Sequence, residues 1–414
     1  MREMKNSGFE WIGTIPCHWN LTRIANLYRV RNQKVSDKDF PPLSVTMKGI
    51  VPQLETAAKT NDGDNRKLVR AGDFAINSRS DRRGSCGISA LDGSVSLINT
   101  VLMPLSEMNP RYYNWLFHTV QFADEYYKCG HGIVDDLWTT TWQEMKKIVI
   151  PTPPLDEQKK IAEFLDAKCS EIDALIADIQ AQIETLEQYK RSTVIETVLK
   201  GLKPGLPTKD SKIDWVGAIP SHWNTHPMYY YFEERKHSNS LGEENNLLSL
   251  SYGKVIRKDI NTNGGLLPNN FNTYNIIEKD DIVLRLTDLQ NDRRSFRTGI
   301  SKERGIITSA YVTLRATKVL NAQYFYYLLH AYDLMKVLYN MGSGVRQGLN
   351  YEELSKMMLI EPLLDEQNEI ATFLDKKCDE INACIEAKKE QIATLEAYKK
   401  SIIFEYVTGK KEVV

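Results

Sequence analysis

Two short segments carry residue types that could perform chemistry on nucleic acids. The first, Asn109-Pro110-Arg111-Tyr112, is close to the Asn-Pro-Pro-Tyr motif with which amino-methyltransferases hold a target amine through an Asn side chain and a carbonyl. The second, Glu157-Gln158-Lys159, matches the end of the Asp…Glu-x-Lys metal site of some nucleases. Both also have a structural interpretation, as residues that begin a helix.

Each segment has a counterpart about 200 residues later, and the counterparts decide between these interpretations. Residues 109–112 correspond to Asn321-Ala322-Gln323-Tyr324, and residues 157–159 correspond to Glu366-Gln367-Asn368. The proline and the lysine are therefore not repeated. No Gly-rich cofactor loop precedes the first motif, and no GxxxxGK[ST] phosphate loop occurs. The comparison leaves no catalytic constellation and favours helix starts in both places.

Arginine-rich loops are the remaining candidates for contact with nucleic acid. Residues 77–85 read Asn-Ser-Arg-Ser-Asp-Arg-Arg-Gly-Ser, and residues 292–299 read Asp-Arg-Arg-Ser-Phe-Arg-Thr-Gly; each loop follows a predicted strand. The guanidinium group presents paired donors that match guanine O6 and N7 or a phosphate, and Ser, Asn and Gln complete base-edge patterns. A single loop of this kind is more often merely solvated. Two loops at equivalent places favour recognition.

The predicted DNA contacts lie in these loops and in nearby turns. Arg346-Gln347 follows a second Gly-x-Gly turn and offers the same chemistry. Lys48 and Lys254, near the ends of equivalent strands, are weaker candidates that would contact phosphate. The full predicted set is Arg79, Arg82, Arg83, Lys48, Lys254, Arg293, Arg294, Arg297, Arg346 and Gln347.

The elements that must position these loops are themselves duplicated. Residues 11–20, Trp-Ile-Gly-Thr-Ile-Pro-Cys-His-Trp-Asn, return as residues 215–224, Trp-Val-Gly-Ala-Ile-Pro-Ser-His-Trp-Asn. Residues 155–190 are identical to residues 364–399 at 22 of 36 positions. Such a tandem duplication predicts a pseudo-symmetric molecule whose two halves do related work.

Each half ends in a long predicted helix, with Asp156 and Asp365 as the predicted N-caps. A helix of roughly 45 residues spans about 65–70 Å, which is longer than a small domain needs. Its narrow apolar stripe favours pairing with the other copy as an antiparallel coiled coil; packing on its own domain is the alternative. The predicted packing residues are Ile161, Leu165, Ile172, Ile176, Ile183, Leu186, Ile370, Leu374, Ile381, Ile385, Ile392 and Leu395.

The predicted fold class is α/β (α+β), with two pseudo-symmetric mixed α/β domains separated by these helices. The first globular domain is expected over residues 1–152 and the central helix over residues 153–201. A Pro/Gly-rich linker at 201–211 opens the second domain, residues 202–361, and the last helix occupies residues 362–414.

Composition excludes several classes of protein. A hydrophobic share of 42% with 26% charged residues is typical of a globular chain and excludes a fibrous or disordered one. No signal peptide and no apolar run of about 18 residues is found, so we expect a cytoplasmic protein without a membrane partner. The six cysteines show no CxxC spacing, so no metal site is predicted. A net charge of −1 means that contact with a polyanion must rest on local clusters.

The combination of duplicated motifs resembles one family. The turn Trp-Ile-Gly-x-Ile-Pro-x-His-Trp, the helix opening Pro-Pro-Leu-Asp-Glu-Gln-x-x-Ile-Ala-x-Phe-Leu-Asp and the connector Gly-Leu-Lys-Pro-Gly-Leu-Pro-x-Lys-Asp-Ser are similar to those of the DNA specificity subunit (S subunit) of type I restriction-modification enzymes. The resemblance covers essentially the whole chain. The second half departs from it at residues 361–364, Glu-Pro-Leu-Leu, which leaves the helix start intact.

The resemblance implies a non-catalytic, sequence-specific DNA-binding subunit. Its two target recognition domains would each read one half of a bipartite, asymmetric target in double-stranded DNA, and the coiled coil would set the spacer. It implies no cofactor in this chain: S-adenosylmethionine, ATP and Mg are expected on two methyltransferase (modification) subunits and on motor-nuclease (restriction) subunits. Base-reading positions vary within the family, so the contacts predicted above rest on residue chemistry alone.

Other functions remain open at this stage. The chain could be a coiled-coil adaptor that binds only proteins, or the recognition half of another methyltransferase system without a nuclease partner. An autonomous methyltransferase or nuclease would rest on residues 109–112 and 157–159.

Overall fold

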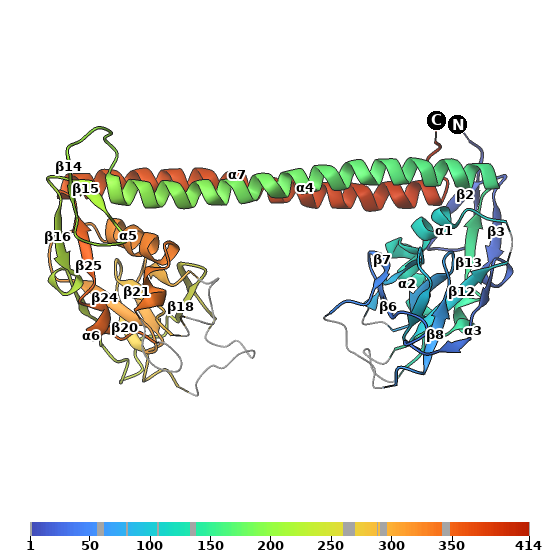
Figure 1. Cartoon of the computed structure of the whole chain (residues 1–414), viewed down its shortest axis with the longest axis horizontal. Coiled ribbons are helices and arrows are strands. Elements are labelled where there is room, and N and C mark those ends of the chain that lie inside the picture. The colour runs from blue at the N-terminus through green and yellow to red at the C-terminus, as the bar shows by residue number, and fades with distance from the viewer. Residues whose placement is uncertain are drawn as a thin grey trace. The chain divides into compact units, whose positions relative to one another are not determined.

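Two compact units make up the chain in this computed structural model (Figure 1). Unit 1 comprises Met1–Gln180 and Lys389–Val414, and unit 2 comprises Ala181–Lys388. Each unit contains one copy of the duplicated globular fold. The structure describes residues 2–55, 62–79, 82–105, 107–132, 138–259, 270–287, 289, 296–341 and 348–413.

Unit 1 is built from short antiparallel strands with helices packed beside them. Its largest sheet has the strand order β10-β9-β12-β4, and a second sheet has the order β11-β8-β5. β3 pairs with β13, which leads into α4. The elements are β1 (Met4–Asn6), β2 (Thr14–Pro16), β3 (Asn20–Arg23), β4 (Tyr28–Val30), β5 (Lys34–Val35), β6 (Leu43–Thr46), β7 (Gly49–Pro52), β8 (Arg66–Val69), β9 (Phe74–Asn77), β10 (Cys86–Ile88), β11 (Gly93–Val95), β12 (Asn99–Pro104), α1 (Pro110–Phe117), α2 (Val120–Lys128), α3 (Trp142–Met145), β13 (Val149–Thr152) and α4 (Leu155–Lys200), which continues into unit 2.

Unit 2 repeats this plan. Its central sheet has the order β17-β24-β21-β22, which matches the central sheet of unit 1, and β16 pairs with β25 as β3 does with β13. The elements are β14 (Thr208–Asp210), β15 (Ala218–Pro220), β16 (Asn224–Pro227), β17 (Phe232–Glu234), β18 (Leu248–Ser251), β19 (Lys254–Arg257), β20 (Asn275–Ile277), β21 (Ile282–Leu284), β22 (Thr298–Ile300), β23 (Gly305–Ile307), β24 (Val312–Ala316), α5 (Ala322–Leu334), α6 (Tyr351–Leu354), β25 (Met358–Glu361) and α7 (Leu364–Val407), which continues into unit 1. The predicted mixed α/β class is confirmed.

An ion pair between a half-buried arginine and a buried aspartate is repeated in the two units. In unit 1, Arg31 Nε lies 2.7 Å from Asp73 Oδ2, and in unit 2, Arg235 Nε lies 2.5 Å from Asp281 Oδ2. Both aspartates are buried and directly precede the central strands β9 and β21. A buried carboxylate is tolerated when it is paired and hydrogen-bonded, so this pair helps to fix where each central strand begins.

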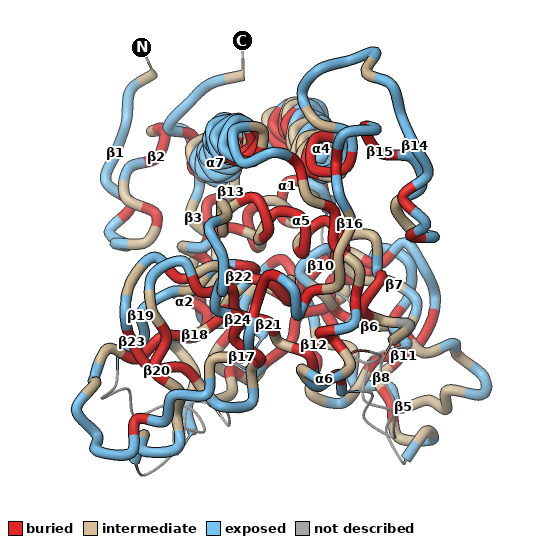
Figure 2. The backbone as a smooth tube through the Cα atoms, turned by 90° about the vertical axis from the view of Figure 1, so that its left-hand side faces the viewer, coloured by how far each residue is buried: buried red, intermediate tan, exposed pale blue. Residues whose placement is uncertain are grey.

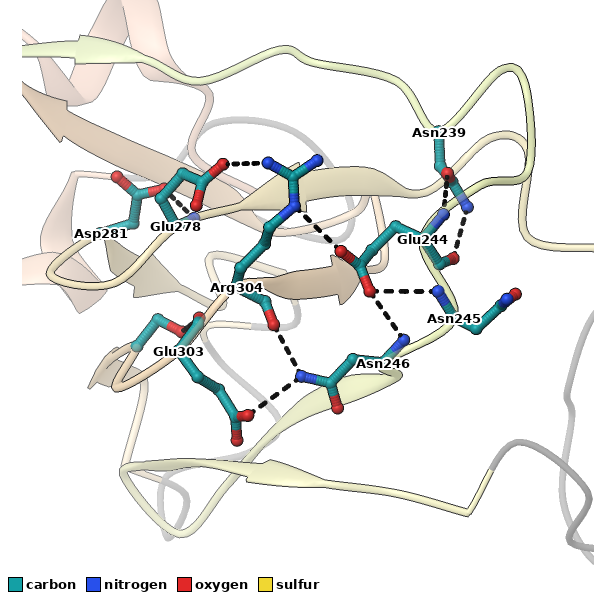
Figure 3. Close-up of polar contacts among 9 residues, drawn as sticks. Asn239, Glu244, Asn245, Asn246, Glu278, Asp281, Glu303 and Arg304 are labelled. Carbon is teal, nitrogen blue, oxygen red and sulfur yellow. Dashed lines mark hydrogen bonds and ion pairs between the residues drawn. The ribbon is translucent and has the colours of Figure 1, made fainter.

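A second ion pair is repeated with its charges exchanged. Arg70 Nη1 lies 2.5 Å from Asp92 Oδ2 in unit 1, whereas Glu278 and Arg304 occupy the equivalent places in unit 2, 2.8 Å apart. Figure 3 shows that Arg304 also reaches Glu244, on the segment that leads to β18. The two copies therefore share the position of this ion pair, but the positive and the negative side chain have changed places.

The long helices run antiparallel in unit 1. Asp173 of α4 accepts a hydrogen bond from Lys399 of α7 at 2.6 Å, and nearer the start of α4 the ring of Phe164 lies 4.3 Å from that of Tyr406. Residue numbers thus fall along α7 as they rise along α4. This is the geometry of an antiparallel pair.

Unit 2 contains the same arrangement. Gln182 of α4 accepts a hydrogen bond from Lys388 of α7 at 2.6 Å, and Lys190 donates to Asn382 at 2.8 Å. The helices pack together as the predicted coiled coil, while much of their outward face is exposed (Figure 2).

The first turns of the long helices belong to the globular cores. Ile161 and Leu165 of α4 lie in the main core of unit 1, and Ile370 and Leu374 of α7 lie in that of unit 2. Packing on a domain and packing on a partner helix therefore both occur, in different stretches of one helix. Of the predicted packing residues, the buried ones are Ile161, Leu165, Ile172, Ile370, Leu374, Ile381 and Ile385, and the half-buried ones are Ile176, Ile183, Leu186, Ile392 and Leu395.

The predicted N-caps of the long helices are wrong by position. α4 begins at Leu155 and α7 at Leu364, so Asp156 and Asp365 lie inside the first helical turn. Carboxylates there still interact favourably with the positive end of the helix dipole.

Candidate nucleic-acid interface

Two chain segments meet where the central strand of unit 1 ends. The Ser78 carbonyl, directly after β9, accepts a hydrogen bond from the Thr140 N–H at 2.9 Å. Arg79 and Thr139 form an antiparallel bridge beside it, and Thr139 also pairs with His131. The Arg-rich segment 77–85 is thereby joined to the segment before α3, although about 60 residues separate them in the chain.

The same joint occurs in unit 2. The Leu286 carbonyl, after β21, accepts from the Leu349 N–H at 3.0 Å, just before α6. Ser78 and Leu286 are equivalent in the two copies, and so are Thr140 and Leu349. A hydrogen bond between backbone groups does not depend on which side chains are present. The two copies can therefore share this bond while the neighbouring side chains differ. We call the two places the unit 1 and unit 2 loop junctions.

Capping boxes fix the segment on one side of each junction. The Thr141 side chain caps α3 and the Glu144 side chain accepts from the Thr141 N–H at 3.0 Å. In unit 2, Asn350 caps α6 and Glu353 accepts from the Asn350 N–H at 3.2 Å. Each reciprocal pair satisfies otherwise unpaired N–H groups and so makes a short helix a rigid support for the junction.

Three of the predicted contacts lie exposed at the unit 1 junction: Arg79, Arg82 and Arg83. The Arg83 guanidinium lies 5.4 Å from the ring centroid of Tyr127 and 3.3 Å from the Asp124 carboxylate. Because Arg83 and Asp124 are both about 60% exposed, this pair is weak and the arginine can exchange it for a phosphate or a base edge.

A polar pocket of about 450 Å³ opens beside Arg79. Asn32, Lys67 and Gln143 also line it, and the Lys67 ammonium donates to the Asn99 carbonyl at 2.6 Å. Burial lowers the pKa of Lys67. Amide, guanidinium and ammonium groups around one cavity supply the donors and acceptors that bind phosphates and base edges. Lys67, Asn32 and Gln143 were not predicted, because they come from a strand, a loop and a helix that are distant in the sequence.

The two predicted phosphate-contacting lysines lie at equivalent hairpins. Lys48 is exposed in the turn between β6 and β7, and Lys254 is exposed at the start of β19, after the turn from β18. A large apolar side chain is also exposed at each turn: Met47 is 71% exposed and Tyr252 is 85% exposed. Both lysines are exposed, so both can contact a phosphate backbone.

Arg297 differs from its prediction. Its side chain is fully buried, and its Nη1 donates to the carbonyls of Arg285 at 3.2 Å and Thr287 at 2.7 Å. Buried and hydrogen-bonded in this way, it does not present its guanidinium to DNA, and we assign it a structural role. The remaining predicted contacts lie outside the described residues; these are Arg293, Arg294, Arg346 and Gln347.

The segment that resembled a methyltransferase motif is a helix start. Asn109 Oδ1 caps α1 by accepting from the Arg111 N–H at 3.0 Å. The Asn109 N–H in turn donates to Gln158 Oε1 at 2.9 Å, and the Asn321 N–H donates to Gln367 Oε1 at 2.9 Å in the second copy. These bonds tie the first turn of each long helix to its globular domain.

The segment that resembled a nuclease site is also structural. Glu157 accepts from Trp19 Nε1 at 3.0 Å and Arg2 Nη2 at 2.8 Å, and its other oxygen lies 2.6 Å from His18 Nε2. Burial alone would raise the pKa of Glu157, but the hydrogen bonds from His18 and Trp19 and the charge of Arg2 hold it below the usual value. Its carboxylate is thus occupied by the repeated His-Trp turn.

Two kinds of feature are absent from the residues that the structure describes. These residues hold no group of three or more His, Cys, Asp or Glu residues placed to bind a metal ion. None of their helices is long and apolar enough to cross a membrane.

Comparison with protein families gives a match in both halves of the chain. The type I restriction modification DNA specificity domain matches residues 17–185 and 243–394. The chain belongs to this family. Each matched range includes one loop junction and part of a long helix, so the two copies of this specificity domain are the duplicated units of the sequence.

Relatives from the same family agree with this. The chain is 29% identical over 276 residues to a putative type I restriction enzyme MjaX specificity subunit of Methanocaldococcus jannaschii, in a match covering 65% of this chain and 61% of that protein. It is 24% identical to the type I restriction enzyme MjaVIII specificity subunit of the same organism over 428 residues, 96% of this chain and 94% of that one.

Solved structures share the fold. A chain from a study of complex assembly and conformational transition in the type I restriction-modification system has a TM-score of 0.69 at 15% identity, covering 96% of this chain and 99% of that one. The HsdS subunit of Thermoanaerobacter tengcongensis has a TM-score of 0.53 at 15% identity, covering 98% and 100%. At this identity the likeness shows a shared fold alone.

Proposed function

We propose that this chain is the non-catalytic DNA-reading subunit of a type I restriction-modification complex. Unit 1 and unit 2 each read one half of a bipartite, asymmetric target through their loop junctions. Two methyltransferase subunits, which bind S-adenosylmethionine, and ATP- and Mg-dependent motor-nuclease subunits supply the chemistry.

The pair of loop junctions is the observation that carries this proposal. Their backbone is alike, since Ser78 and Leu286 accept equivalent hydrogen bonds, but the surrounding side chains differ. Two readers built on one frame with different polar groups would recognise two different half-sites. The exposed Arg79, Arg82 and Arg83 and the polar pocket of unit 1 provide donors suited to guanine and phosphate.

The coiled coil supports the proposed spacer. Helix length is fixed at about 1.5 Å per residue, so α4 and α7 are suited to act as a ruler between two readers. Their exposed outer faces leave room for partner subunits.

Methylation mapping tests the proposal. The chain is co-expressed with the methyltransferase subunit of its own system, and methylated adenines are located across a genome by methylation-aware sequencing. One bipartite, asymmetric motif with a fixed spacer is expected. A continuous palindrome, or no methylation by an assembled complex, would contradict it.

A domain exchange then separates the readers. Replacing residues 21–150 with those of a relative should change one half-site and leave the other intact. A change in both halves would show that the units do not read independently, and DNA binding unaffected by loss of all exposed junction arginines would favour a protein-binding adaptor.

A further inference from the structure

Equivalent tyrosines lie beside the segment that follows the central strand in each unit, Tyr127 directly and Tyr339 through Arg297. Tyr127 and Tyr339 each occur three residues before the Gly-x-Gly sequence of their copy. An arginine guanidinium lies over each ring, Arg83 at 5.4 Å in unit 1 and Arg297 at 5.2 Å in unit 2. The two arginines differ in environment, because Arg83 is exposed and Arg297 is fully buried.

In unit 2 the buried arginine joins three places in the fold. Its Nη1 donates to the carbonyls of Arg285 and Thr287, at the end of the β21 segment, and its Nε donates to the Tyr339 hydroxyl at 3.2 Å. Its own N–H donates to the buried Asp333 carboxylate of α5 at 2.8 Å. A buried guanidinium is stable only when its donors are satisfied, so these acceptors hold it in one position.

In unit 1 the tyrosine makes the equivalent contacts directly. The Tyr127 hydroxyl lies 3.3 Å from the Asn77 carbonyl and 3.4 Å from the Arg82 carbonyl, on either side of the Arg-rich loop. The Tyr127 carbonyl accepts from Trp138 Nε1 at 2.8 Å, on the second segment of the junction. Asn77 is the repeat equivalent of Arg285, so the same backbone carbonyl is held in both units.

We infer that Tyr127 in unit 1 and the Tyr339–Arg297 pair in unit 2 are positioning residues for DNA sequence specificity. The inference rests on the proposed function. Neither group reads a base. Each holds the segment after the central strand of its unit against the segment that precedes the Gly-x-Gly sequence. Base discrimination requires donors and acceptors to be placed within about 0.5 Å, so a loosened junction reads its half-site less strictly.

Replacing either tyrosine with phenylalanine removes one hydroxyl and keeps the ring. Tyr339→Phe removes the hydroxyl that accepts from Arg297 Nε, and Tyr127→Phe removes the hydroxyl that lies against the Asn77 and Arg82 carbonyls. Each variant is prepared in the whole complex with its methyltransferase subunits, and Tyr189→Phe, on the half-exposed Tyr189 of α4, is the matched control. The readouts are the methylated motif and methylation rates on oligonucleotides with single mismatches.

The two variants should relax opposite half-sites. Preference for the correct base should fall about tenfold at one or more positions of the affected half, the order expected for one lost base contact. Binding to non-specific DNA and its salt dependence should not change, since no phosphate contact is removed. Thermal unfolding of each complex, measured alongside, separates this effect from loss of structure; if one variant does not fold, the other tests the same inference in its own unit.

The inference would be overturned if both variants folded and kept the wild-type motif and mismatch discrimination, or if either relaxed both halves equally. These results differ from failure of the proposed function, in which the wild-type complex itself would yield no bipartite motif.

Discussion

The indole Nε1–H of Trp19 donates to Glu157 Oε2 at 3.0 Å, which fixes the repeated His-Trp turn to the first turn of α4. In the second copy Trp223 donates to Glu366 at 3.1 Å. Both tryptophans are fully buried. The most strongly repeated residues of the chain thus serve to set the angle at which a long helix leaves its globular domain.

This contact predicts an acid-dependent stability. The pKa of Glu157 is held below the usual value of 4.5, so ionised Glu157 stabilises unit 1 at neutral pH, and the contribution is lost as the pH falls through the lowered pKa. Glu157→Gln should lower the free energy of unfolding by roughly 1–3 kcal/mol at pH 7, because a charge-assisted hydrogen bond is lost. Urea unfolding from pH 3 to 7 should show the difference shrinking below about pH 4.5.

Glu184→Gln, at an exposed position of α4, is the control for Glu157→Gln and should change stability little at any pH. An equal effect of the two substitutions at pH 7 would contradict a specific role for Glu157.

The coiled coil should depend on its buried stripe. Ile172 is 2% exposed and Leu175 is 51% exposed on the same helix. Ile172→Ala should destabilise unit 1 by about 2–5 kcal/mol, whereas Leu175→Ala should stay within about 0.5 kcal/mol. Thermal unfolding of both variants checks this, and similar losses would show that the stripe is not where the helices pack.

Matched insertions test the ruler role of the helices. Seven residues added after Gln180 in α4 and seven after Lys388 in α7 preserve the heptad phase and lengthen each helix by about 10 Å. At about 3.4 Å per base pair, the spacer of the methylated motif should grow by about three base pairs. An insertion in α4 alone breaks the pairing and is the control. An active double insertion with an unchanged spacer would refute the ruler.

The hairpin lysines should affect DNA binding through salt. Lys48→Ala and Lys254→Ala should each weaken binding of the complex to any DNA sequence, and each lost phosphate contact should reduce the slope of log K against log salt by about 0.9. Lys203→Ala, exposed in the linker, is the control. Affinity titrations at several salt concentrations measure this, and a change of motif without a change of slope would mean base contact instead.

Much of the fold could be predicted because the duplication repeats the same sequence patterns in both halves of the chain. The 3.6-residue periodicity of residues 155–190 and 364–399 depends only on local sequence. Both helices and their pairing could therefore be predicted. The predicted caps Asp156 and Asp365 lie two residues beyond the cap positions, since α4 begins at Leu155 and α7 at Leu364.

The site was harder to predict, and Arg297 shows why. In sequence it belongs to the same Arg-rich loop as Arg293 and Arg294, but its acceptors include a tyrosine hydroxyl 42 residues away that only the folded chain supplies. Ser85 occupies the equivalent position in unit 1. Comparison of the two copies therefore could not predict that Arg297 is buried. The same holds for the pocket beside Arg79, whose lining residues come from segments distant in the sequence, helix α3 among them.

The composition of unit 1 has a consequence for synthesis on the ribosome. Its core includes Ile403 and Val407, and the Tyr112 hydroxyl donates to the Val407 carbonyl at 2.8 Å across 295 residues of chain. Unit 2 has all its residues once Lys388 has emerged, whereas unit 1, which begins first, must wait for the end of α7. The core of unit 1 is therefore completed only after all of unit 2 has been synthesised, and its apolar surface against Ile403 and Val407 stays uncovered until α7 has emerged.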